Sequence, residues 1–296
     1  MNEELRTMHL FAGAGGGILA DLILGHRPIV AVEWDKYACE VLRARAEDGW
    51  FDGMSVWEGD VRLFDPSEYK GRVDCIHAGF PCTDISTAGT KTGVGEDTRS
   101  GLYREVLRIA DVLQPRYLFL ENVSAIVTGD NGSMLRTVVG DVAERGYDAV
   151  WCCLSASEIG ANHKRDRWWL LAYTNCNSES DESINGQQIR MVADSCGTRG
   201  EIRLSEQKQW QERNTEVADN GSNRRSWRKG KSYWSVEPNV GRVADGVASR
   251  SHRLKALGNG QVPLQAATAF KILWEEHNAI KTASRKGGSD VKGITR

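Results

Sequence analysis

Short apolar runs alternate with stretches of helical periodicity from the N-terminus to about Tyr173. The runs are rich in β-branched and aromatic residues, which is typical of buried strands, and the stretches between them place apolar residues three and four positions apart. The predicted strands are 7–11, 29–33, 55–57, 73–77, 117–121, 149–154 and 168–172, and the predicted helices are 35–47, 101–113 and 133–145. This alternation predicts an α/β fold, with a mostly parallel sheet and helices on both faces.

The composition changes abruptly at Asn175. Polar residues and glycine dominate down to about Lys231 and the apolar periodicity disappears, which predicts an inserted lobe or a long loop region. Helical patterning returns from Arg253, and Pro263 opens a predicted helix over 263–276. We therefore expect a large domain at 1–173, a small irregular lobe at 174–240, a return segment at 241–280 that completes the large domain, and a disordered basic tail at 281–296.

The charge is nearly balanced, with a formal net charge of −2 and 26% charged residues. This excludes the global basic field that characterises many nucleic-acid-binding proteins. A local exception is the stretch 213–231, where six basic residues face two acidic ones and Trp227 lies among the cations. Such a stretch suits a nucleic-acid backbone with exposed bases, although a solvated loop can have the same composition.

The sequence lacks the patterns of a membrane-spanning helix, a signal peptide and a zinc site. The apolar runs are far shorter than the about 20 residues that a membrane-spanning helix needs, and the N-terminus has no signal-peptide pattern. We expect a soluble cytoplasmic protein with no membrane association. The seven cysteines are an odd number without zinc-ligand spacing, which predicts reduced thiols and no metal site.

A glycine-rich turn follows the first predicted strand at 11–17 and opens a helical stretch. Gly13 and Gly15 match the dinucleotide-binding pattern G-x-G-x-x-G, but Ile18 occupies its last position. A turn of this kind lets the backbone approach a ligand closely. The incomplete pattern does not support a pyrophosphate cradle, so a nicotinamide dinucleotide is disfavoured.

Three further residues indicate a nucleoside ligand. Glu33 lies at the end of the second predicted strand, twenty residues after Gly13, where a carboxylate can accept hydrogen bonds from ribose hydroxyls. Trp34 could stack on adenine, or could be a packed aromatic residue. Asp60, after the third strand, could accept from an exocyclic amine. Ribose and adenine contacts without a phosphate cradle fit S-adenosyl-L-methionine better than NAD.

Candidate reacting groups come at the ends of two neighbouring predicted strands. Pro81 and Cys82 directly follow the run that ends at Phe80, and Glu121 ends the next strand. Because functional groups gather at the carboxyl ends of parallel strands, a thiol and a carboxyl group would share one crevice. The alternatives are a cysteine that only fills the core and a glutamate on the surface. The glycine-punctuated loop 83–101 is long enough to close over a substrate.

Two arginines, Arg165 and Arg167, alternate into the last strand of the large domain. One of them can face the crevice, and the other can pair with an acid.

Five segments resemble the ordered motifs of the DNA (cytosine-5) methyltransferases. They stand in the order and approximate spacing of that family, over about 1–173 and 241–275, and they are 11–17, 79–82, 121–123, 165–167 and 258–263. The sequence is therefore identified as a member of this family, of phage, prophage or bacterial type.

The resemblance implies a Rossmann-like methyltransferase sheet with a small irregular target-recognition lobe. It further implies that a monomer transfers a methyl group from S-adenosyl-L-methionine to C5 of a cytosine flipped out of double-stranded DNA. Cys82 would add to C6 of the base, Glu121 would hold N3 and the 4-amino group, and Arg165 would bind the O2 edge. Arg167 is the second arginine of the matched pair.

The resemblance and the residue patterns together predict a set of cofactor contacts. The expected residues are Phe11, Ala12, Gly13, Gly15, Gly16, Glu33, Trp34, Asp60, Pro81, Leu102 and Asn259. Thr83 and His163 stand where this family often has other residues, and their roles are open.

Three alternatives accompany this interpretation. The same chemistry could act on RNA, or the protein could be a catalytically silent DNA-binding protein of the same fold. A nicotinamide oxidoreductase is the third, and Ile18 disfavours it.

Overall fold

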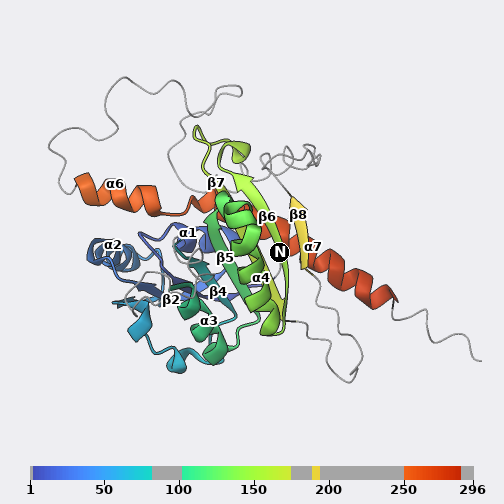
Figure 1. Cartoon of the computed structure of the whole chain (residues 1–296). Helices are drawn as coiled ribbons and strands as arrows, with labels where there is room; N and C mark the ends of the chain where they lie inside the picture. The colour runs from blue at the N-terminus through green and yellow to red at the C-terminus, as the bar shows by residue number, and fades with distance from the viewer. Residues whose placement is uncertain (1–2, 82–101, 175–188, 194–249, 288–296) are drawn as a thin grey trace, which may run out of the picture.

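The strands predicted from the apolar runs pair into one twisted sheet, seen in Figure 1. This computed structural model describes residues 3–81, 102–174, 189–193 and 250–287. The strands among these residues are β1 (Arg6–Leu10), β2 (Arg27–Glu33), β3 (Ser55–Glu58), β4 (Cys75–Gly79), β5 (Tyr117–Val123), β6 (Tyr147–Ser155), β7 (Asp166–Thr174) and β8 (Ile189–Ala193). Their order across the sheet is β3-β2-β1-β4-β5-β7-β6-β8.

The sheet is mostly parallel, as the sequence predicts. Strands β1 to β5 pair in parallel, and β7 runs antiparallel between β5 and β6. The strand order reverses between β1 and β4, because β2 and β3 lie on one side of β1 and β4 and β5 on the other. At such a switch point the loops leave the two strands in opposite directions, and a crevice opens at the carboxyl ends.

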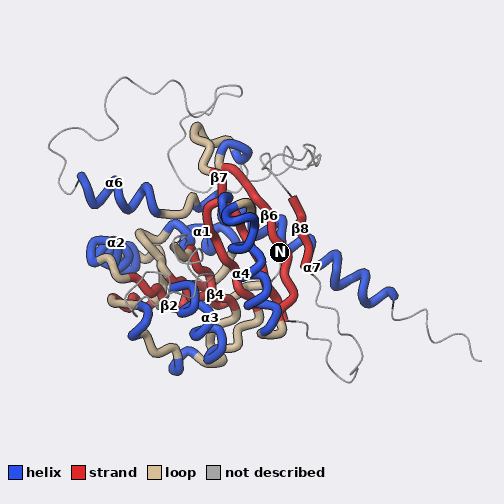
Figure 2. The backbone as a smooth tube through the Cα atoms, viewed as in Figure 1, coloured by secondary structure: helices blue, strands red, loops and turns tan. Residues whose placement is uncertain are grey.

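Helices cover both faces of the sheet (Figure 2). On one face, α3 (Leu102–Leu113) and α4 (Ser133–Glu144) bury Val106 and Val138 against strand residues such as Leu118. On the other face, α1 (Gly16–Leu24) and α7 (Pro263–Gly287) bury Ala20 and Phe270. Helix α2 (Lys36–Glu47) packs beside α1, and α6 (Arg250–Asn259) precedes α7.

The C-terminal helix packs on the sheet of the large domain. Helix α7 packs against α1 and against β6 and β7, although about ninety residues of sequence separate it from β7. The hydrophobic effect explains this packing over a long sequence separation. Apolar residues of α7 such as Leu273 are removed from water by packing on the sheet.

Two predicted boundaries are wrong. Strand β8 lies inside the span predicted as an irregular lobe, yet it pairs in parallel with β6. A strand of this kind is defined by its partner, and its own short sequence in a polar region carries little signal. Helix α7 continues to Gly287, beyond the predicted start of a disordered tail at 281, because the residues after Lys281 include good helix formers and no proline.

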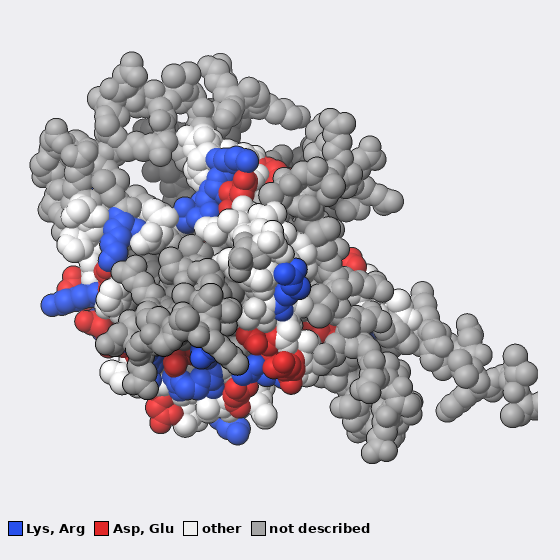
Figure 3. Space-filling view, in the orientation of Figure 1, with Lys and Arg blue, Asp and Glu red and all other residues white. Residues whose placement is uncertain are grey.

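On the described part of the face in Figure 3, basic and acidic side chains are interspersed, in agreement with the balanced composition. None of the helices in the described ranges has the length and apolar character needed to cross a bilayer.

Candidate active site

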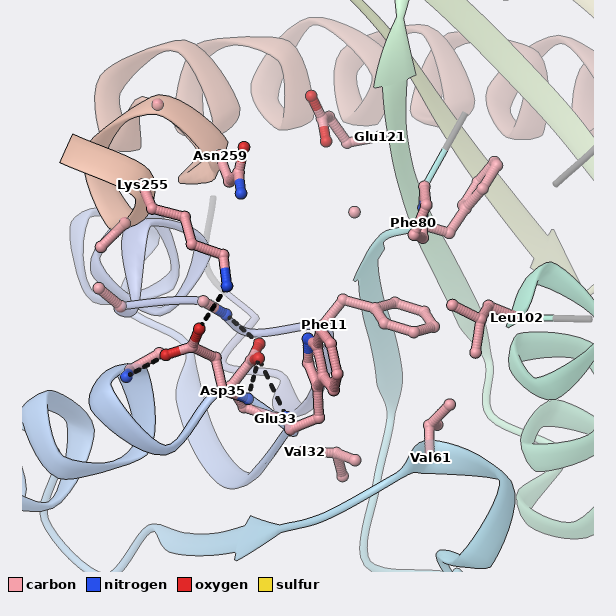
Figure 4. Close-up of a pocket in the computed structure, with 18 of the residues that line it drawn as sticks. Phe11, Val32, Glu33, Asp35, Val61, Phe80, Leu102, Glu121, Lys255 and Asn259 are labelled. Carbon is pink, nitrogen blue, oxygen red and sulfur yellow. Dashed lines mark hydrogen bonds and ion pairs between the residues drawn. The ribbon is translucent and has the colours of Figure 1, made fainter. Parts of the chain in front are cut away.

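A cavity of about 720 Å³ opens at the carboxyl ends of the central strands, at the switch point of the sheet. Residues from β2, β4 and β5 line it, together with the turns that follow β1 and β3 and the helix α6 (Figure 4). This volume lies in the range of small-molecule sites, about 300–1,000 Å³. The predicted site residues that line it are Phe11, Gly13, Glu33, Trp34, Asp60, Pro81, Leu102, Glu121, Asn259, Arg165 and Arg167.

Glu33 holds the turn after β1 against the end of β2. Its Oε2 accepts a hydrogen bond from the backbone N–H of Gly13 at 2.7 Å, and its Oε1 accepts from Trp34 and Asp35 at 3.0 and 2.8 Å. The turn needs this support, because Phe11 and Gly13 both have positive φ angles, of 57° and 54°. Oε2 accepts only this one bond from the described residues, so it keeps a lone pair with which to accept a hydroxyl proton.

Trp34 offers an open aromatic face. Its side chain is 72% exposed and lines the cavity, so the alternative of a packed core residue is wrong. The Nζ atom of Lys255 on α6 lies 5.7 Å from the centroid of the Trp34 ring and 2.6 Å from Asp35. Asp35 also caps α2 by accepting from the N–H of Ala38. These contacts tie α6 to the start of α2 across the cavity (Figure 4).

Asp60 begins the short 3₁₀ turn Val61–Leu63 and pairs with Arg62. The hydrogen bonds from Arg62 lower the pKa of the Asp60 carboxyl, so the group at this edge of the cavity is an ionised acceptor.

Three predicted cofactor residues do not line the cavity. Ala12, Gly15 and Gly16 are absent from its wall, and the reason is clear for Gly16. A Cβ atom there would lie 2.2 Å from the carbonyl oxygen of Gln261, so the glycine is required by the return segment that packs on the start of α1. Gly15 has a φ of 93°, and a Cβ atom there would lie 3.0 Å from Leu42. Part of the glycine run therefore serves packing rather than ligand approach.

Glu121 is a largely buried carboxyl group at the other end of the cavity, with a side chain that is 13% exposed. Its Oε1 lies 2.8 Å from Nε of Arg167, and Gln261 hydrogen-bonds to the same carboxyl group. Burial raises the pKa of Glu121 above its ordinary value, although Arg167, Arg165 and Gln261 oppose the rise. The direction of this shift is the one that the sequence-based mechanism favours for Glu121.

The two arginines have different tasks. Arg167 pairs with the acid, which one of the two arginines was expected to do. Arg165, with a φ of 39°, donates from its guanidinium to the carbonyls of Gly258, at 3.0 Å, and Gly260. Its Nε is buried and has no partner among the described residues. Arg165 therefore ties the return segment to the site and keeps one N–H for another acceptor.

The predicted nucleophile Cys82 and its neighbour Thr83 lie outside the described residues. The backbone that leads to Cys82 is held by Asn122, whose Nδ2 donates to the carbonyl of Phe80 at 3.1 Å. Asn122 is buried, and its Oδ1 accepts from the N–H of Val123. The residue belongs to the predicted Glu-Asn-Val motif, but nothing in the sequence assigned it this role.

Gln261 was also missed, although it belongs to the predicted segment 258–263. A glutamine carries no distinctive catalytic signal, so only its contact with Glu121 reveals it. His163 is exposed and does not line the cavity.

The fold and the site together define a Rossmann-like α/β protein with a cavity at its switch point and a largely buried carboxyl group in the cavity wall. The model of the C-5 cytosine-specific DNA methylase family matches residues 5–287, and the chain belongs to this family.

Among its curated relatives, the type II methyltransferase M.CviJI of Paramecium bursaria Chlorella virus IL3A is 39% identical over 57% of this chain and 43% of its own length. The type II methyltransferase M.HhaI of Haemophilus parahaemolyticus is 33% identical over 58% of this chain and 50% of its own. A solved structure of a DNMT2 variant from Spodoptera frugiperda aligns with a TM-score of 0.49 at 19% identity, over 64% of this chain and 55% of that chain. The matched regions thus span about half the length of the curated relatives.

Proposed function

We propose that this protein transfers a methyl group from S-adenosyl-L-methionine to C5 of a cytosine flipped out of double-stranded DNA, through a covalent bond between Cys82 and C6. The observation that carries the proposal is the largely enclosed Glu121, whose pKa is raised by desolvation and which lies in the wall of the cavity. Family membership supplies the chemical class.

The cavity residues fit S-adenosyl-L-methionine. Glu33 offers a carboxylate oxygen to ribose hydroxyls, Trp34 offers an exposed ring face to adenine, and Asp60 offers an ionised acceptor to the exocyclic amine. When bound, the cofactor supplies an electrophilic methyl group. Phe11 and Leu102 give the cavity an apolar wall on one side.

Glu121 then supports the addition of the thiolate. Attack of Cys82 on C6 pushes an electron pair toward N3 of the ring, and the proton on Glu121 moves to N3 to neutralise it. After C5 takes the methyl group it loses its proton to a base, the C6–S bond breaks, and the N3 proton returns to Glu121. Arg167 holds the carboxyl group in place during this exchange, and Arg165 would present an N–H to O2 of the base.

A base inside a duplex cannot reach this cavity, so it must rotate out of the stack. We propose that the remainder of the span 174–240 outside β8 recognises the target, and that DNA lies between it and the large domain. The protein would act as a monomer, in the cytoplasm of a bacterium or of a phage-infected cell.

Covalent trapping tests the proposal. The full chain is incubated with S-adenosyl-L-methionine and duplex DNA that carries 5-fluorocytosine, because fluorine at C5 blocks the final elimination. We expect a denaturant-resistant complex with the wild type and none with Cys82→Ser. Trapping by RNA alone would redirect the proposal to RNA, and binding of DNA without trapping would support a silent DNA-binding protein. Bisulfite sequencing of DNA from expressing cells would then identify the target sequence.

A further inference from the structure

The ring of Trp34 lies in the cavity wall without support from the protein core. Its side chain is 72% exposed, so interior packing does not fix its orientation. Its backbone is held by Glu33, which accepts from the Trp34 N–H at 3.0 Å. The centroid of the indole ring lies 5.7 Å from Nζ of Lys255, within the range of about 6 Å that a cation–π contact requires. The ammonium group of Lys255 therefore attracts the ring to one place.

Asp35 fixes the ammonium group of Lys255. A lysine side chain is long and flexible, but Nζ of Lys255 donates to Oδ2 of Asp35 at 2.6 Å (Figure 4). The other oxygen of this carboxyl group, Oδ1, accepts from the N–H of Ala38 at 3.1 Å and caps α2. The hydrogen bond from Lys255 lowers the pKa of Asp35, so the carboxyl group is an anion at neutral pH. One oxygen thus anchors Asp35 to the helix and the other holds the cation.

Helix α6 carries Lys255 to this place, and a second contact seats the helix on α2. His252 lies three residues before Lys255, on the same side of α6. Its ring centroid is 5.4 Å from that of Tyr37, with 33° between the ring planes. At the other end of α6, Arg165 donates to the carbonyl of Gly258 at 3.0 Å. The position of the helix therefore decides where the ammonium group stands.

We propose that Lys255 is a positioning residue of the cofactor site. Held by Asp35, its ammonium group restrains the indole ring of Trp34 as a preformed wall of the cavity, on which adenine stacks. The inference rests on the proposed function for the identity of the ligand, and it goes further by giving a role to Lys255, which lines the cavity. A ring that is ordered before the cofactor binds loses less conformational entropy on binding, so the restraint should raise affinity.

The size of the effect follows from the kind of contact. An exposed cation–π contact changes an equilibrium constant by about two- to fivefold, and an exposed ion pair by up to about fivefold. Loss of the ammonium group should therefore weaken cofactor binding by about two- to fivefold. The Tm should change little, because the Lys255 side chain is 53% exposed.

Calorimetric titration with S-adenosyl-L-methionine tests the assignment. Lys255→Met and Asp35→Asn should both weaken binding, and the asparagine keeps the cap of α2. Lys255→Arg should retain the affinity, because a guanidinium group also pairs with a carboxylate and stacks on an aromatic ring. The matched control is Arg45→Met, which removes an ion pair with Asp48 of similar exposure on α2, outside the cavity wall. Equal affinities of Lys255→Met, Arg45→Met and the wild type would overturn the proposal.

A double-variant cycle tests whether Lys255 acts through the ring. In protein that already carries Trp34→Ala, the further change Lys255→Met should cause no additional loss of affinity, because the group that it positions is absent. The same loss with and without Trp34 would mean that Lys255 binds the cofactor directly, and the positioning role would be wrong.

A further measurement does not depend on the cofactor. In protein labelled with 5-fluorotryptophan, the ¹⁹F resonance of Trp34 is identified by its absence in Trp34→Phe, and its transverse relaxation reports the mobility of the ring. We expect the ring to become more mobile in Lys255→Met and Asp35→Asn, but not in Arg45→Met. Unchanged relaxation in Lys255→Met refutes the restraint even if the cofactor binds. If the ring responds but the wild type does not bind S-adenosyl-L-methionine, the proposed function fails and the restraint stands.

Discussion

Replacement of Gly16 by alanine tests whether the return segment packs on the start of α1. A Cβ atom at this position would lie 2.2 Å from the carbonyl oxygen of Gln261 and 3.0 Å from its carbonyl carbon, and both are backbone atoms that cannot rotate away. Ordinary contact begins at 3.4 Å, so the segment must retreat by about 1 Å. Overpacking of this kind costs about 1–3 kcal/mol.

The assay is thermal unfolding of the full chain. For a domain of this size, 1 kcal/mol corresponds to about 2–4 °C, so we expect Gly16→Ala to lower Tm by about 3–10 °C. Gly140→Ala is the matched control, because Gly140 lies inside α4 with no atom within 4 Å of the added Cβ. Alanine there should raise Tm slightly, since it is the better helix former by about 1 kcal/mol.

The displaced segment also carries Asn259, which lines the cavity. Gly16→Ala should therefore weaken binding of S-adenosyl-L-methionine, measured by calorimetry at a temperature where the variant is folded, and Gly140→Ala should not. A Tm of Gly16→Ala equal to that of the wild type would refute the reasoning, because it would mean that the segment does not contact α1 as described.

Trp34→Ala should weaken cofactor binding about tenfold, because it removes about one stacking contact. The Tm should change little, because the ring is 72% exposed. Trp50→Ala, 57% exposed and outside the cavity wall, should leave calorimetric affinity unchanged. Asn122→Ala should lower Tm and slow 5-fluorocytosine trapping at least tenfold, because it frees the backbone that leads to the nucleophile. Arg6→Gln should lower Tm at neutral pH but not in acid. Burial acts to raise the pKa of Asp74, but the hydrogen bonds and charge of Arg6, together with the charge of Arg116, bring it below its ordinary value. The stabilisation therefore exists above the unfolded pKa of about 3.9 and disappears as pH falls through the lower folded value. A Tm difference that persists in acid would contradict this.

Much of the sheet could be predicted from the sequence, because strand pattern and strand-end chemistry are local signals. Apolar runs locate β1 to β7 to within a few residues, and the same runs place Glu33 and Glu121 at strand ends. A raised pKa of Glu121 would help the proposed chemistry, and desolvation by burial raises it.

Contacts between distant segments could not be predicted in this way. The sequence marks Gly16 as one glycine of a ligand-binding turn, whereas the fold uses it to admit the backbone of Gln261. The sequence does not distinguish Arg165 from Arg167. In the fold, Arg165 donates to the carbonyls of Gly258 and Gly260 in the return segment, whereas Arg167 pairs with Glu121.

By itself, then, the sequence determined which segments are strands and helices, which carboxyl groups end the strands, and which family the motifs resemble. The tertiary structure decided which of these groups meet: the addition of β8 to the sheet, the contact of Glu121 with Gln261, and the burial of His9, Asp21 and His77 in one layer. The physical reason is that periodicity records which side of an element avoids water, but not which distant element will cover it.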